Sequence, residues 1–238
     1  MRHTRWTTLV CAIFLTVSLP ALAGGRRLAN DQSVQARLGA FFVEGESDFW
    51  DDNVDIFTLE PSDFDDVTFG MTYSHSFNRF FELDLNTDFF DQAVVSEYND
   101  FVDGSGFPIL HDSSLEMIPV TVGVRFLPFG RAKAGKKKPV FFVGAGGGVN
   151  FWQYEEVGDF IDFADPGNPI VFGVFSESGE AFVGYATAGL ELPITHGMNI
   201  GFETRWFNSD DKLGGDFAGL GEIDLSGFSA SVSANWRF

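Results

Sequence analysis

The chain has 238 residues, of which 34 are acidic and 15 basic, and phenylalanine alone occurs 29 times. A formal charge of −19 excludes nucleic acid as an expected partner, because phosphate binding needs a positively charged surface. The length allows one large β domain or two small domains.

The first 23 residues have the pattern of a cleaved export signal. Arg2 and Arg5 form a basic start, the apolar run over residues 9–19 is too short to span a bilayer, and Ala21 and Ala23 form a small-x-small cleavage site. The only cysteine, Cys11, lies within this signal peptide, so the mature chain needs no disulfides. Removal of the signal peptide leaves 13 basic and 34 acidic residues, a net charge of −21. We expect either a soluble secreted β protein or an outer-membrane barrel.

Eight segments of alternating apolar and polar residues follow a short segment over residues 24–33, which we expect to lie in the periplasm. A period of two is typical of strands with one apolar and one polar face. In the first segment Leu38 and Phe42 oppose Gln35 and Arg37, and the last, "SGFSASVSANWRF", alternates to its end. The predicted strands are 34–43, 66–74, 79–90, 115–127, 139–152, 181–192, 198–208 and 226–238.

The fifth segment carries the run Gly-Ala-Gly-Gly-Gly over residues 144–148. No Gly-Lys-Ser/Thr follows it and no helix is indicated after it, so it is not a phosphate-binding loop. Alternate glycines on a strand instead indicate space for large side chains across a narrow interior.

The connections between the predicted strands alternate between long and short. Long ones cover 44–65, 91–114, 155–180 and 209–224, and short ones cover 75–78, 128–138 and 193–197. With Asp66, the long connections contain 27 of the 34 acidic residues and one lysine, whereas 128–138 contains five basic residues. Such a rhythm is typical of strands that cross a membrane back and forth.

Three features favour an apolar face toward lipid over a lipocalin-like soluble barrel. Each strand is long enough to span a bilayer when tilted. Charges of both signs occur on the polar face, which suits a polar lumen: Arg37, Glu82, Asp84, Arg125, Glu191, Glu203, Arg205 and Arg237. Aromatic residues collect near strand ends, as in interfacial girdles: Phe80, Phe81, Phe89, Phe90, Phe126, Phe151, Trp152, Trp206, Phe207, Trp236 and Phe238. We therefore predict an all-β, closed, antiparallel up-and-down transmembrane barrel of eight strands over residues 34–238.

Two stretches carry a family resemblance. The terminal "SVSANWRF" resembles the last strand of bacterial outer-membrane proteins, whose final aromatic is recognised by the barrel-assembly machinery. The hairpin "MIPVTVGVRFLPFG…KKKPVFFVGAGGGVNFW" is similar to the fourth and fifth strands of small OmpA/OmpW-type barrels. The resemblance implies a Gram-negative outer-membrane location, contact with lipid and lipopolysaccharide, and an assembly signal at Trp236 and Phe238. It leaves the oligomeric state open.

Three functions remain open from the sequence. The preferred one is a non-enzymatic structural or surface protein whose lumen is filled by the charged network, because an eight-stranded barrel is narrow. The alternative is a narrow porin or, as resemblance to OmpW implies, a channel for small apolar molecules. A lipid-modifying enzyme is less favoured. Its only candidate is His111 in "LHDSS", since His75 and His196 fall in short periplasmic turns.

The first long loop is a candidate cation site. Carboxylates suit Ca²⁺ or Mg²⁺, but the loop lacks the glycine and distal glutamate of an EF-hand, and a solvated acidic surface is the preferred interpretation. Phe49, Trp50, Phe57 and Phe64 in the same loop suggest packing or a partner. The candidate cation ligands are Asp48, Asp51, Asp52, Asp55, Asp63, Asp65 and Asp66.

Overall fold

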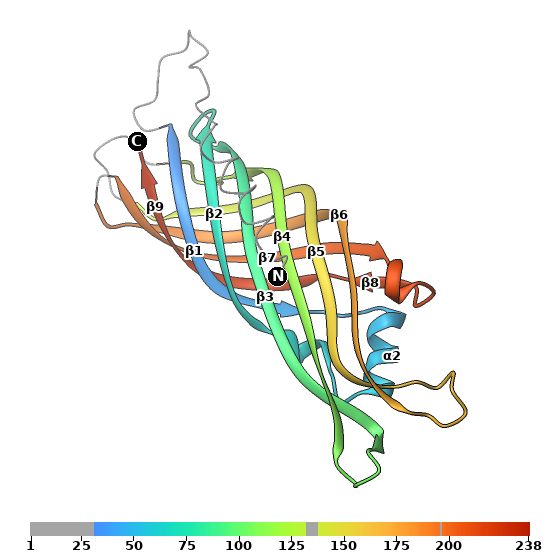
Figure 1. The fold of residues 1–238 in the computed structure, drawn as a ribbon. Helices are drawn as coiled ribbons and strands as arrows, with labels where there is room; N and C mark the ends of the chain where they lie inside the picture. Colours follow the sequence, from blue (N-terminus) through green and yellow to red (C-terminus); the bar gives the residue numbers. More distant parts are fainter. Residues whose placement is uncertain (1–30, 132–137, 196) are drawn as a thin grey trace.

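A closed antiparallel barrel of eight strands makes up most of the molecule (Figure 1). The computed structural model describes residues 31–131, 138–195 and 197–238, so the predicted signal peptide lies outside the described residues. The predicted fold class is confirmed. The barrel strands are β1 (Gln32–Val43), β2 (Asp66–Ser76), β3 (Phe81–Val102), β4 (Pro108–Phe126), β5 (Val140–Ile161), β6 (Ile170–Pro193), β7 (Met198–Lys212) and β9 (Gly227–Arg237).

The first and last strands close the ring. β1 pairs with β9 from Ser33 opposite Arg237 to Val43 opposite Gly227, and β7 lies between β6 and β9. A short strand, β8 (Glu222–Asp224), pairs only with the end of β7. Closure matters in hydrocarbon, because a backbone group without a partner there costs several kcal/mol.

An apolar belt surrounds the barrel. Leu38, Val122 and Val232 are each at least half exposed and point outward near its middle. On β6 the belt ends at Phe182, above which Glu180, Ser178 and Ser176 point outward. Aromatic side chains are exposed at both levels where the belt ends: Phe42, Phe69, Phe182, Trp206 and Phe228 at one, Phe81, Phe126, Phe141, Trp236 and Phe238 at the other.

The girdle prediction was wrong for three aromatic residues. Phe90, Trp152 and Phe207 are buried inside the barrel, not exposed at its surface. Each lies next to an outward-facing aromatic in sequence, and successive residues of a strand point to opposite faces. An aromatic pair at a strand end therefore places one ring in lipid and the other in the interior.

Two of the predicted long loops were also wrong. Residues 91–114 and 155–180 consist mostly of strand, since β3 extends to Val102, β4 starts at Pro108, β5 extends to Ile161 and β6 starts at Ile170. Both hairpins continue beyond the belt, toward the end that we call extracellular (Figure 1). A strand that continues beyond the belt needs no continuous apolar outer face, so its pattern differs from that of the segments within the belt.

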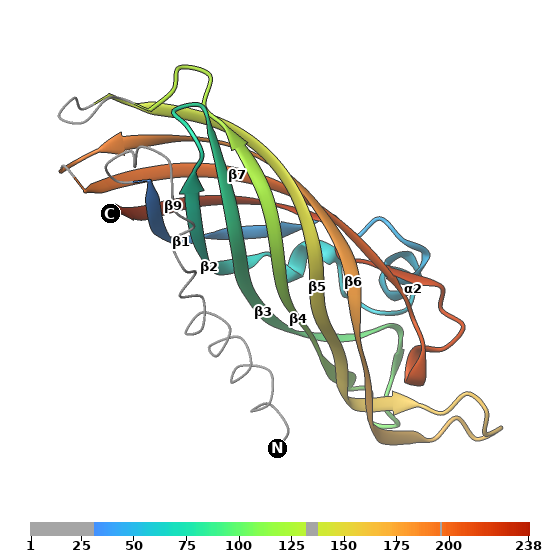
Figure 2. The same cartoon turned by 90° about the horizontal axis from the view of Figure 1, so that it is seen from above.

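The first long loop folds back over the barrel mouth (Figure 2). It contains α2 (Asp48–Ile56) and the 3₁₀ turn η1 (Pro61–Phe64), and a second 3₁₀ turn, η2 (Gly215–Phe217), lies in the last long loop. Phe49, Trp50 and Phe64 are almost fully buried, so the loop is packed and not merely solvated. Among the described residues, no helix is both long and apolar enough to cross a bilayer.

Candidate functional site

The lumen of the barrel contains a network of ion pairs. Its members come from β1, β3, β4, β6, β7 and β9 and from the turn that follows β4. All eight charged residues predicted for the lumen lie in it, together with Asp88 and Arg131, which had not been assigned to it. The described members are five arginines, Arg37, Arg125, Arg131, Arg205 and Arg237, and five carboxylates, Glu82, Asp84, Asp88, Glu191 and Glu203.

Arg125 is at the centre of the network and is 1% exposed. Its Nε lies 2.9 Å from Asp84 Oδ2, its Nη1 lies 3.2 Å from Glu191 Oε1, and its Nη2 lies 3.9 Å from Glu203 Oε2. The guanidinium also lies over the ring of Phe142, 4.1 Å from the centroid. One cation thus links carboxylates from three different strands.

Arg131 closes the end of the lumen opposite the two long hairpins, which we call the periplasmic end. It follows β4 in a turn and reaches back into the barrel, where its Nη1 donates to Glu191 Oε2 at 2.6 Å and its Nη2 to Glu82 Oε2 at 2.6 Å. Arg237, from the last strand, donates through Nη1 to Glu82 Oε1 at 3.2 Å. Two buried carboxylates that face each other therefore share cations from both sides, which offsets their mutual repulsion.

A second layer lies nearer the extracellular end. Asp88 accepts from Arg37 Nη2 at 2.8 Å and from Arg205 Nη1 at 3.0 Å, and Arg205 Nη2 also donates to Glu203 at 2.5 Å. Arg205 lies over the ring of Tyr185, 4.8 Å from the centroid. The ring takes the space that two glycines leave free, as the glycine pattern predicted. A Cβ at Gly123 or Gly146 would overlap the Tyr185 side chain.

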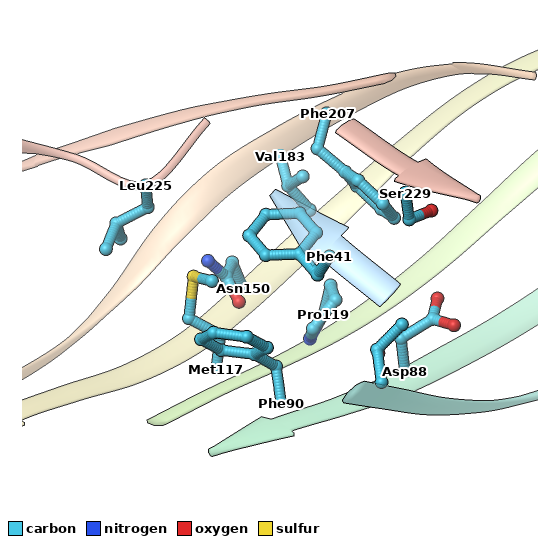
Figure 3. A pocket seen from close by; sticks show the side chains of 11 residues that line it. Phe41, Asp88, Phe90, Met117, Pro119, Asn150, Val183, Phe207, Leu225 and Ser229 are labelled. Carbon is cyan, nitrogen blue, oxygen red and sulfur yellow. The ribbon is translucent and has the colours of Figure 1, made fainter. Parts of the chain in front are cut away.

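A small cavity separates this layer from the apolar end of the lumen (Figure 3). Its volume is about 30 Å³, enough for one or two water molecules. Asp88, Phe41 and Phe90 are among its lining residues, and Asn150, which lies next to Met117 in Figure 3, has a buried Oδ1 with no hydrogen-bond partner among the described residues. Polar and apolar side chains therefore both line the cavity.

An apolar cap fills the extracellular end of the lumen. The ring of Phe49, from α2, lies 5.2 Å from the ring of Tyr154, which projects inward from β5. Trp50 packs edge-on against Phe64 at 5.4 Å, and its Nε1 donates to the carbonyl oxygen of Asp224 at 2.8 Å. The side chains below the cap are equally apolar: Phe41, Phe90, Leu115, Met117, Val183 and Phe207.

His111, the candidate catalytic base, is buried under the cap. Its Nε2 lies 2.9 Å from Ser96 Oγ across the β3–β4 hairpin, and its ring contacts that of Phe57 at 4.2 Å. Asp112 and Ser114 point to the opposite face of β4, so "LHDSS" does not form a catalytic constellation. The His111–Ser96 pair has no carboxylate bonded to the histidine Nδ1, which has no partner among the described residues.

The pH dependence of the cap follows from His111. Burial lowers the pKa of His111 from 6.5 to about 4, although the carboxylate of Asp112 opposes the shift. The unfolded state therefore takes up a proton at higher pH than the folded state, and the stabilising contribution of His111 is present above pH 6.5 and lost toward pH 4. Burial raises the pKa of Glu156, so protonation of Glu156 at low pH favours the folded state and opposes the effect of His111.

A comparison of the wild type with the variant His111→Gln separates the contribution of His111 to the pH dependence from that of Glu156, because Glu156 is present in both proteins. We expect proteolysis of the β3–β4 hairpin in the wild type to accelerate between pH 6.5 and pH 4 relative to the variant. Limited digestion with an acid-tolerant protease, followed by mass spectrometry, measures this ratio. A ratio that does not change with pH would contradict the prediction.

The candidate cation ligands do not converge on one point. Among the described residues, no group of three or more His, Cys, Asp or Glu side chains is arranged to hold a metal ion. Asp63 accepts from the backbone of Glu60 at 2.9 Å, and Asp65 from that of Val43 at 2.9 Å. Asp48, Asp51, Asp52, Asp55 and Asp66 are exposed or partly exposed on or near α2 and η1. Cation binding by this loop stays a prediction.

The chain ends at the periplasmic rim of the barrel. Trp236 and Phe238 are 46% and 60% exposed, and the backbone of Phe238 exchanges two hydrogen bonds with Gln32. The last strand is thus fully paired while its terminal aromatic rings face outward.

Sequence reasoning missed Asp88 and Arg131 for different reasons. Asp88 has the same parity as Glu82 and Asp84 on β3, so the alternation contained the signal. Arg131 lies in a turn, where no periodicity indicates direction, and it had been counted with the basic residues of residues 128–138.

Comparison with known proteins gives a likeness in fold. No protein-family model and no curated protein sequence matches the chain. The outer-membrane protein OprG of Pseudomonas aeruginosa superposes with a TM-score of 0.54 at 12% identity over 89% of this chain and 97% of OprG. Ail of Yersinia pestis (TM-score 0.42, 13% identity, 88% and 99% covered) and the N-terminal barrel of OprF of P. aeruginosa (0.38, 10%, 88% and 98%) are more distant. The OprG superposition shows the fold of a small outer-membrane β-barrel.

Proposed function

We propose that this chain is an integral protein of the Gram-negative outer membrane, of a structural or surface type, with a lumen that does not conduct. The balanced ion-pair network carries the proposal, because five arginines matched by five carboxylates fill the narrow part of the barrel. The apolar belt supports a membrane location, and the apolar cap supplies a second closure above the network.

The ends of the barrel support its orientation and assembly. The acidic hairpins and the cap face the outside, β1 begins and β9 ends toward the periplasm, and the belt contacts the lipid and lipopolysaccharide. We propose that Trp236 and Phe238 form the signal for the barrel-assembly machinery; their exposure on a fully paired last strand supports this role.

A catalytic role is not part of the proposal. The Ser96–His111 pair is the strongest candidate for nucleophilic chemistry, and both side chains are at most 3% exposed, under Phe57 and next to Tyr98. A lipid substrate would have to displace the cap to reach Ser96.

Planar-bilayer recording on refolded protein tests the closed lumen. We expect no resolved current steps from the wild type under conditions in which a general porin gives them. Reproducible steps of one size would contradict the proposal and favour the alternative of a narrow pore.

The variant Arg131→Ala gives a second test between a lumen closed by the ion-pair network and a narrow conducting pore. It removes the cation that bridges Glu82 and Glu191 at the periplasmic end, while Arg125 and the cap stay in place. We therefore expect Arg131→Ala to remain non-conducting, since two closures are left. A current that appears in this variant alone would show that Arg131 is the only barrier.

A further inference from the structure

The extracellular part of β6 has one edge without a neighbouring strand in the described chain. β6 pairs with β5 from Ile170 to Glu191, but with β7 only from Val183 to Pro193. The turn η2 covers part of the remaining edge, because the backbone N–H of Ser176 donates to Asp216 Oδ2 at 3.0 Å. Residues 170–175 stay uncovered, and the hairpin that contains them projects past β7 and β8 (Figures 1 and 2). We call residues 170–175 the β6 edge.

Large apolar side chains are exposed along the β6 edge and beside it. Phe172 is 71% exposed and Val174 54%. Leu110 on β4 and Val95 on β3 are exposed on the same outer face of the sheet, two and three strands away from β6. On β6 itself, the polar side chains of Ser176, Ser178 and Glu180 separate Phe172 and Val174 from the apolar belt. Exposed apolar surface next to unpaired backbone groups is a site where another strand can pair.

Charge restricts the possible partner. Residues 91–114 and 153–182, which make up the two projecting hairpins, contain twelve acidic residues and no lysine or arginine. A second copy of this chain has the same charge, and two copies inserted in one membrane would present β6 edges that run in the same direction. Anionic lipid headgroups are disfavoured for the same electrostatic reason. An extended basic segment with apolar residues at alternate positions complements both the charge and the apolar face.

We propose that the β6 edge binds an extended basic peptide segment of another protein, which adds to the sheet as a further strand beside β6. This inference rests on the proposed function, since it requires the hairpins to lie outside the membrane. Main-chain hydrogen bonds provide the affinity, and contacts of alternate side chains with Phe172 and Val174 select for apolar residues. The acidic hairpins increase the association rate of a basic partner and make binding dependent on salt.

Alternation along the strand identifies the backbone groups to remove. Because the N–H of Ser176 faces the free edge, the N–H groups of Val174 and Phe172 face it too. Val174→Pro therefore deletes a donor to the incoming strand and spares the bonds to β5, whereas Val174→Ala keeps the donor and shortens the side chain. The two variants form a matched pair.

The experiment measures binding of a fluorescent ten-residue peptide of alternating lysine and valine to the refolded barrel in zwitterionic nanodiscs. We expect saturable binding, a loss of about tenfold in affinity for Val174→Pro, and a loss of less than about threefold for Val174→Ala. The same peptide with glutamate in place of lysine should not bind. Equal affinities for the two variants would show purely electrostatic attraction and would overturn the proposal, as would a peptide that does not bind the wild type.

A gel shift between boiled and unboiled samples reports the folded barrel in each case. If Val174→Pro lacks the folded band, Phe172→Ser takes its place, because it leaves the backbone intact and removes the most exposed apolar contact; the expected loss is again about tenfold. A folded, non-conducting barrel that binds no peptide overturns this inference and leaves the proposed function standing. Failure of the wild type to insert into lipid overturns both.

Discussion

Replacing Arg125 by methionine is expected to lower the free energy of unfolding by about 3–5 kcal/mol. The guanidinium lies between Asp84, Glu191 and Glu203, and its removal leaves three buried carboxylates with one cation fewer. Methionine has a similar volume, so the loss comes from uncompensated charge and not from a cavity. Chemical unfolding in lipid vesicles, followed by tryptophan fluorescence, gives the difference.

Arg79→Gln is the matched control for Arg125→Met. Arg79 is an exposed arginine in the turn between β2 and β3, where it lies over the ring of Phe80 and forms no ion pair with the lumen carboxylates among the described residues. We expect a change of less than about 1 kcal/mol there. Adding Asp84→Asn to Arg125→Met should restore part of the stability, because it removes one of the unpaired charges. Equal effects of the Arg125 and Arg79 variants would contradict the role of the network.

Trp50→Ala is expected to release the apolar cap and to leave the barrel closed. Trp50 is 1% exposed, contacts Phe64 and Tyr154 and donates to Asp224. Truncation of a buried tryptophan costs about 3–5 kcal/mol of stability. Because the contacts of Trp50 lie within the cap, we expect this loss to destabilise the cap and not the barrel. Hydrogen exchange of α2 should accelerate strongly, while exchange in the membrane-spanning strands should not change.

Val54→Ala provides the comparison for Trp50→Ala within the same helix. Val54 is exposed, so its truncation should leave the exchange rate of α2 nearly unchanged. The Trp50→Ala protein should still pass no current, because the ion-pair network below the cap is intact. If α2 exchanges at the same rate in both variants, the cap is not held by its aromatic core. If Trp50→Ala conducts, the network alone does not close the lumen.

Much of the barrel could be predicted from local pattern. The alternation that places Leu38 outward and Arg37 inward is a property of any extended chain. Because eight segments each have an apolar face for lipid, and no backbone group in hydrocarbon can be left without a partner, the eight strands must form a closed ring. The same rule identified the eight predicted lumen charges. It failed where the surroundings change, because the hairpin extensions lie in water and alternate differently from the segments in lipid.

The packed cap over the barrel mouth could not be predicted from the alternation of apolar and polar residues. The acidic residues of 44–65 indicated a solvated loop, and only its aromatic residues suggested packing. The structure separates the two sets: α2 buries Phe49 and Trp50 toward Tyr154 and exposes Asp51 and Asp52 on its other side. One short helix with two faces accounts for both signals.

The sequence by itself determined the eight barrel strands, the inward position of the eight predicted lumen charges and the concentration of negative charge at one end, because these depend on order along the chain. Only the tertiary structure decided that Asp88 bridges Arg37 and Arg205, that Arg131 reaches into the lumen, and that residues 170–175 of β6 lack a neighbour. These features depend on register and on distances across the lumen between strands far apart in sequence. Such distances are set by closure of the whole ring and cannot be obtained from any single strand.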